Sequence, residues 1–199
     1  MFVQVIQGRV NDAAALKQRL EAWRNEVGRD AKGWLGATSG TSEDGEFVAL
    51  VRFESEEAAR ANSDRPEQGA WWQETAQFFE GEPTFYDCTE VDTFLGGGSD
   101  DAGFVQIMEG RADREQLRSR AQELEENLKR MRPDVIGGII AWHGDGGFTQ
   151  AVYFKSEAEA RERESQQLSE EDASGRDEML SMLQDLRYID LKDPLLQSA

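Results

Sequence analysis

Cysteine, histidine and basic residues are scarce in this chain of 199 residues. A single cysteine, Cys88, excludes an internal disulfide, and a single histidine, His143, argues against a metal site built from imidazole and thiolate ligands. Lys and Arg number 22 against 40 Asp and Glu, so the net charge is 22 − 40 = −18. A polyanion repels phosphate backbones and anionic lipid, so we expect neither a nucleic-acid nor a membrane partner.

Long apolar runs are also missing. The longest nearly apolar run, Val135–Trp142, is far shorter than the roughly 20 residues of a membrane helix. Residues Met1–Val5 lack the cationic stretch and the apolar segment of a signal peptide. We therefore expect a reduced, cytoplasmic protein. Its hydrophobic fraction of 38% supplies enough material for a core.

An internal repeat is the most informative feature that the sequence does contain. Phe2–Arg9 returns as Phe104–Arg111 with five of eight residues identical at an offset of 102. Phe53–Arg60 returns as Phe154–Arg161, again with five of eight identical, at an offset of 101. Collinear matches of this kind indicate a duplicated fold unit.

The repeat predicts how the chain is divided. We expect a first unit over residues 1–95 and a second over residues 103–199. Residues 96–102, with the sequence Gly-Gly-Gly-Ser-Asp-Asp-Ala, have the small, polar composition of a flexible linker.

Hydrophobic periodicity and turn signals predict the same elements in both units. Expected strands of the first unit are Phe2–Val10, Gly33–Thr41, Glu46–Phe53 and Phe85–Val91. Its expected helices are Ala13–Val27, a short one from Ser55, and one from Pro66 to about Phe79. In the second unit we expect one helix carrying Leu117, Leu124 and Leu128, the strands Val135–His143 and Phe148–Phe154, and a last strand at Tyr188–Leu191.

The resulting order, β-α-β-β-α-β, is that of the ferredoxin-like fold, in which both helices cover one face of a four-stranded antiparallel sheet. The other face is bare and needs a cover. We therefore predict an α+β protein of two tandem ferredoxin-like units, packed sheet to sheet as an intrachain α/β barrel.

This double order, with the paired blocks Phe-Val-Gln-Val-Ile-Gln-Gly-Arg and Phe-x-Ser-Glu-x-x-Ala-Arg, resembles the dimeric α/β-barrel superfamily. Within that superfamily it is similar to the antibiotic-biosynthesis-monooxygenase-like proteins and to two-unit proteins of high-GC bacteria. The family usually builds its barrel from two chains, so the resemblance implies a pseudo-dimer within one chain, as a monomer or a weak homodimer. It also implies kinship with oxygenases that use no cofactor and act on polyketide-like phenols.

Haem-degrading members of the family use an Asn, a Trp and a His. This chain departs from that pattern, because its first strand carries Gln4 and Gln7 and no histidine follows Trp71 and Trp72. We accordingly expect no cofactor and no metal.

Trp71 and Trp72 are the first candidate site residues. On a helix they lie about 100° apart and begin two adjacent apolar stripes. Their counterparts in the second unit are Asp172 and Ala173, which suggests an aromatic pocket wall in the first unit alone. The alternative is that one ring is core and the other covers a seam between units.

Gln4 and Gln106 repeat at matching sites within apolar strands. If Val3 and Val5 face the helices, Gln4 faces the barrel interior, where a buried amide can orient a ligand. The alternative is a symmetric pair that bonds across the internal interface.

His143 is the candidate general base, because histidine titrates near neutral pH. The alternative is a solvated histidine at the end of a hairpin. Cys88 has no histidine near it in sequence, so we interpret it as structural.

Two functional hypotheses follow. The first is a cofactor-independent, monooxygenase-like enzyme acting on a small aromatic substrate, with Trp71 and Trp72 as the pocket wall, Gln4 or Gln106 orienting the substrate and His143 as the base. The second is a non-catalytic small-molecule-binding or stress-related protein that uses the same barrel cavity.

Overall fold

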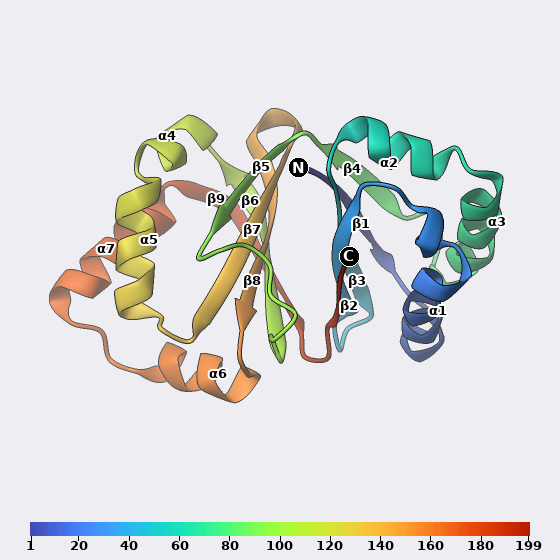
Figure 1. Cartoon of the computed structure of the whole chain (residues 1–199). Helices are drawn as coiled ribbons and strands as arrows, with labels where there is room; N and C mark the ends of the chain where they lie inside the picture. The colour runs from blue at the N-terminus through green and yellow to red at the C-terminus, as the bar shows by residue number, and fades with distance from the viewer. The chain divides into compact units, whose positions relative to one another are not determined.

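The chain folds into two compact units (Figure 1). The computed structural model describes the backbone of residues 1–199 and every side chain except that of Glu171. The first unit consists of Met1–Val91 with Asp193–Ala199, and the second of Asp92–Lys192. Each contains an antiparallel five-stranded sheet with helices, so the predicted α+β class with two ferredoxin-like units is confirmed. The sheet-to-sheet barrel stays a prediction.

The first unit follows the expected order. Its elements are β1 (Phe2–Arg9), α1 (Ala13–Glu26), η1 (Gly28–Asp30), β2 (Trp34–Thr41), β3 (Glu46–Phe53), α2 (Glu56–Ser63), α3 (Pro66–Thr75), η2 (Ala76–Phe78) and β4 (Thr84–Cys88). Side-chain caps begin two of the helices: Asp12 accepts a hydrogen bond from the Ala15 amide, and Ser55 from the Ala58 amide. Pro66 occupies the first turn of α3, where its missing N–H costs nothing.

The second unit repeats the order of the main helices and strands, but it begins with β5 and has two helices where the first unit has α1. Its elements are β5 (Glu90–Phe94), β6 (Phe104–Ala112), α4 (Arg114–Ser119), α5 (Ala121–Met131), β7 (Val135–His143), η3 (Gly144–Gly146), β8 (Gly147–Phe154), α6 (Glu157–Ser165), α7 (Glu170–Ser181) and β9 (Leu183–Leu191). The single helix expected near Leu117 is two helices, because Arg120 between them has the non-helical angles φ −115° and ψ 8°.

The two sheets share their strand register. Phe2 pairs with Phe53 in one, and Phe104 with Phe154 in the other. Both second strands have an irregularity at the same place, after Trp34 in β2 and after Val135 in β7. The register therefore relates β6 to β1 at an offset of 102, and β7 and β8 to β2 and β3 at an offset of 101.

The unit boundaries differ from the expected division into 1–95, 96–102 and 103–199. The first sheet has the order β10-β2-β3-β1-β4, in which β10 (Leu195–Ser198) is the last strand of the chain. The second sheet has the order β5-β7-β8-β6-β9, so β5 pairs with β7. Each repeat thus ends in a strand that joins the sheet of the other unit, a pairing that hydrophobic periodicity within one repeat does not reveal.

The helices cover the face of the first sheet on which Gln4 lies, and not the face of Val3 and Val5. Phe2 and Ile6 belong to clusters that pack against α1 and α3, and Gln4 shares their face. Val3 and Val5 therefore point away from the helices. Both faces of β1 are apolar, so alternation alone could not decide between them. None of the described helices combines the length and the apolar character needed to cross a membrane.

Candidate functional site

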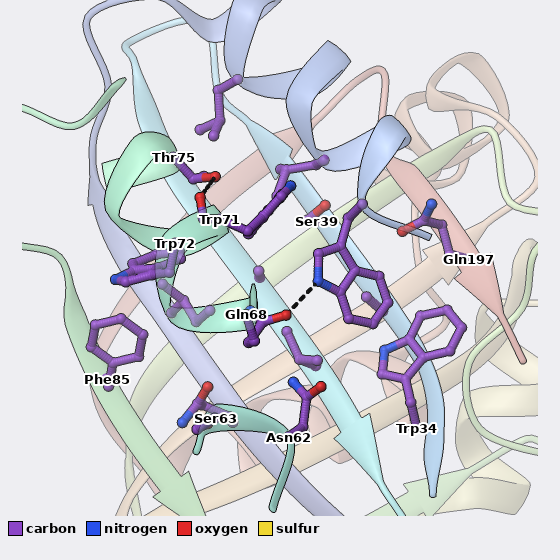
Figure 2. A pocket seen from close by; sticks show the side chains of 18 of the residues that line it. Trp34, Ser39, Asn62, Ser63, Gln68, Trp71, Trp72, Thr75, Phe85 and Gln197 are labelled. Carbon is purple, nitrogen blue, oxygen red and sulfur yellow. Dashed lines mark hydrogen bonds between the residues drawn. The ribbon is translucent and has the colours of Figure 1, made fainter. Parts of the chain in front are cut away.

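A pocket of about 250 Å³ lies between the helix-covered face of the first sheet and the helices of that unit (Figure 2). All of its lining residues belong to the first unit. The strands contribute Gln4, Trp34, Ala37, Ser39, Ala49, Val51, Phe85 and Gln197, among others. The helices contribute Leu16, Leu20, Trp23, Asn62, Gln68, Trp71, Trp72 and Thr75, among others.

Aromatic rings form most of the wall. Four of the five tryptophans of the chain line the pocket. The rings of Trp23 and Trp34 are tilted with their centroids 5.1 Å apart, and Trp72 meets Phe85 edge to face at 5.3 Å. Such surfaces offer both faces and edges to another aromatic ring.

Two of these tryptophans are held in place by hydrogen bonds. Trp23 Nε1 donates to Gln68 Oε1 at 2.8 Å, which ties α1 to α3. Trp71 Nε1 donates to Glu26 Oε2 at 3.0 Å. The guanidinium of Arg19 lies 5.0 Å from the centroid of the Trp71 ring. These contacts fix the orientation of Trp23 and Trp71 in the pocket wall.

Trp34 has an unused hydrogen-bond donor. Its side chain is 7% exposed, and its Nε1 has no hydrogen-bond partner among the described residues. Figure 2 shows the nitrogen edge of this ring turned toward the other lining side chains. A buried unpaired donor costs about 1–3 kcal/mol, which a hydrogen-bond acceptor on a ligand would relieve.

Asn62 presents a second donor. Its Oδ1 accepts a hydrogen bond from Arg65 Nη1 at 2.9 Å. A guanidinium can only donate, so the atom facing Arg65 is oxygen and the amide NH₂ is the group left for the pocket. Ser39, a buried residue that is 4% exposed, adds a hydroxyl group.

Among the described residues that line the pocket, none carries a charge or an acid–base group that titrates near neutral pH. Placing an ion in such surroundings costs several kcal/mol, because nothing compensates for its lost hydration. The pocket is consequently suited to an uncharged molecule with an aromatic body and a hydrogen-bond acceptor.

The pocket reaches solvent where two of its lining residues are exposed. Ser63 ends α2, and Phe85 on β4 is 43% exposed. Beside them Gln4 Nε2 donates to Asp87 Oδ1 on the neighbouring strand at 2.9 Å. Gln4 is therefore already oriented by its own sheet.

The structure brings Trp71, Trp72 and Gln4 together in one pocket. It does not bring Gln106 there, because Gln106 belongs to the second unit, where its Nε2 donates to Asp190 Oδ1 at 2.9 Å. The Gln4–Asp87 and Gln106–Asp190 pairs are equivalent. Each glutamine thus bonds within its own sheet.

His143 lies at the end of β7 in the second unit and is not among the residues that line the pocket. Its Nε2 is 3.3 Å from Thr149 Oγ1. Burial lowers the pKa of His143 below its usual 6.5, against the raising effect of the nearby Glu109 carboxylate. His143 therefore contributes no side chain to the lining of this pocket, and its role as a base stays a prediction.

Cys88 is fully buried in β4. Desolvation, followed by the negative charge of Asp87, raises the pKa of its thiol to about 12. A thiol that does not ionise near neutral pH is a poor nucleophile, in agreement with a structural role. Among the described residues, no three His, Cys, Asp or Glu side chains gather as a metal site would require.

Several pocket residues escaped the sequence argument. Trp34 and Ser39 could have been found by comparing the repeats, since Val135 and Ile140 stand opposite them at the offset of 101. Trp23 shared the periodicity of an ordinary core helix. Gln197 gave no signal, because its strand crosses into the first unit only in the folded chain.

Comparison with solved structures identifies the fold of the chain. No family model and no curated protein matches the chain. A "putative monooxygenase" from Fusobacterium nucleatum is 12% identical with a TM-score of 0.74, covering 99% of this chain and 94% of that one. A second "putative monooxygenase", from Lactobacillus acidophilus, is 10% identical with a TM-score of 0.66, covering 98% of both chains.

An anthrone oxidase-like protein is also similar, with 10% identity, a TM-score of 0.65, and coverage of 100% of this chain and 91% of that one. These full-length matches show that the chain shares the fold of these three proteins. At such identities a shared fold does not carry a shared activity.

Proposed function

We propose that the first unit binds a small, uncharged aromatic molecule in the pocket between its sheet and its helices. The observation that supports this most directly is a space of about 250 Å³ walled by four tryptophans and lined by no charged side chain. Ring-to-ring contacts contribute about 0.5–1.5 kcal/mol each beyond the burial of apolar surface. The donors on Trp34 and Asn62 would orient an acceptor such as a carbonyl or hydroxyl oxygen.

Oxygenation of the bound molecule is the second candidate function, favoured by the full-length fold match to proteins named monooxygenases. Without a cofactor the substrate itself must supply the electrons. For 1-naphthol the balanced reaction is 1-naphthol + O₂ → 1,4-naphthoquinone + H₂O, in which one oxygen atom enters the ring and the other leaves as water. No lining residue can take up the phenolic proton, so it would pass to water while the pocket orients the ring.

Isothermal titration with 1-naphthol tests the binding proposal. Trp72→Ala removes a half-buried wall residue and should weaken binding at least tenfold. Tyr188→Ala removes an aromatic side chain that is 50% exposed in the second unit, and should leave binding unchanged. Equal affinity in both variants, or no binding by the unmodified chain at millimolar 1-naphthol, would overturn the proposal.

Oxygen consumption separates the two candidates. Uptake of one O₂ per 1,4-naphthoquinone formed, abolished in the Trp72→Ala variant, would establish oxygenation. Binding without oxygen uptake would leave ligand binding as the function of the pocket.

A further inference from the structure

The end of the pocket is built by the last strand of the chain. In β10 Gln197 pairs with Ala37 of β2, and the side chains of both residues line the pocket. The carbonyl oxygen of Gln197 accepts a hydrogen bond from Arg52 Nη2 at 3.2 Å. Arg24 donates to the carbonyl oxygen of Ser198. This part of the wall is therefore fastened to the sheet and to α1.

The second unit likewise receives a strand from the end of the other repeat, and we call β5 and β10 the crossing strands. In the second unit the crossing strand fills the space beside the sheet instead of bordering a pocket. Gly138 of β7 is the counterpart of Ala37 at the offset of 101. The ring of Phe94, from β5, lies so close over Gly138 that a Cβ there would be less than 3.0 Å from the ring carbons. Phe94 packs with Phe104 and Phe154 in a hydrophobic cluster. A large ring from the crossing strand thus fills the helix side of this sheet.

We propose that Gln197 is the residue that keeps the first pocket open and sets the size of the ligand it takes. This inference rests on the proposed binding function. An amide side chain at this position borders the cavity without filling it, whereas a phenyl ring would occupy the space as Phe94 does in the second unit. Ligand binding in the first unit thereby depends on a residue contributed by the end of the second repeat.

The matched variants are Gln197→Phe and Ser198→Phe. They add the same ring to adjacent residues of β10, which point to opposite faces of the sheet. With 1-naphthol as the probe in isothermal titration, Gln197→Phe should lose at least tenfold in affinity, and Ser198→Phe should stay within twofold of the unmodified chain. Equal affinity in all three proteins would overturn the inference and leave the binding function standing. A lack of binding by the unmodified chain would instead refute the binding function itself.

Gln197→Ala covers the case in which the larger residue disturbs folding. This variant enlarges the end of the pocket, so the affinity for 1-phenylnaphthalene relative to 1-naphthol should rise at least threefold. An unchanged ratio would contradict a role for Gln197 in setting ligand size. The urea midpoint of each variant, followed by fluorescence, shows whether it is folded under the conditions of titration.

Discussion

Replacing Gly36 by alanine probes the junction between β2 and the crossing strand β10. Gly36 has a φ of +143°, which L side chains rarely adopt. A Cβ at this position would lie less than 3.0 Å from both Arg52 Nη2 and the carbonyl oxygen of Gln197. Those two groups are joined by a hydrogen bond, so the new methyl group must break it or push β10 away.

The expected cost has two parts. Holding a non-glycine residue at this backbone angle costs about 1–3 kcal/mol. Losing the hydrogen bond of a buried guanidinium costs a further 1–3 kcal/mol, roughly. We expect Gly36→Ala to lower the free energy of unfolding of the first unit by about 2–6 kcal/mol and to weaken 1-naphthol binding, because Gln197 leaves the pocket wall.

Urea unfolding followed by tryptophan fluorescence measures the change in the free energy of unfolding of the first unit, since four of the five tryptophans lie in that unit. A Trp142→Phe background removes the fifth. Gly69→Ala is the matched stability control, because Gly69 lies in α3 of the same unit with nothing within 4 Å of an added Cβ. In that helix alanine should stabilise by about 0.5–1 kcal/mol. A Gly36→Ala loss below about 1 kcal/mol would refute the argument that Gly36 is required for the docking of β10.

Three further predictions concern other parts of the fold. Phe94→Ala should destabilise the second unit by about 2–3 kcal/mol in urea unfolding monitored by Trp142, because a cavity opens over Gly138; an unchanged midpoint would contradict this. Iodoacetamide should modify Cys88 at least a hundredfold faster in urea than in the folded protein, since burial shields a thiol whose pKa is about 12; equal rates would refute it. NMR titration of His143 should give a pKa below 6.5. As the pH is lowered below about 6.5 the unfolded chain takes up the proton first, so the free energy of unfolding should decrease. A pKa above 6.5 would contradict both expectations.

The internal repeat made it possible to predict the fold from the sequence. Matching blocks at Phe2 and Phe104 define where each unit begins, and capping residues such as Asp12 and Ser55 locate helix starts within a residue or two. The ends of the units were less accessible. The last strand of each repeat, β5 in the first and β10 in the second, pairs with a strand of the other repeat. Pairing between distant segments leaves no local pattern in the sequence.

Only part of the candidate site could be predicted from the sequence. Trp71 and Trp72 stood out because the second repeat lacks both rings, and they do line the pocket. The face on which Gln4 lies could not be assigned from the sequence, because valines and larger apolar residues alternate on β1 without a polar side. His143 stood out only by its rarity, and rarity does not place a residue near a ligand. Gln197 could not be identified, since its place in the pocket depends on the return of the chain to the first unit.

The indole N–H signals of the five tryptophans offer the most direct measurement of the central claim, that a small aromatic molecule binds inside the first unit. Trp23, Trp34, Trp71 and Trp72 line the pocket, and Trp142 lies in the second unit. In a ¹⁵N–¹H titration with 1-naphthol, the four lining indoles should shift together with one dissociation constant while Trp142 stays in place. Absence of any shift, or a shift of Trp142 equal to the others, would contradict the claim.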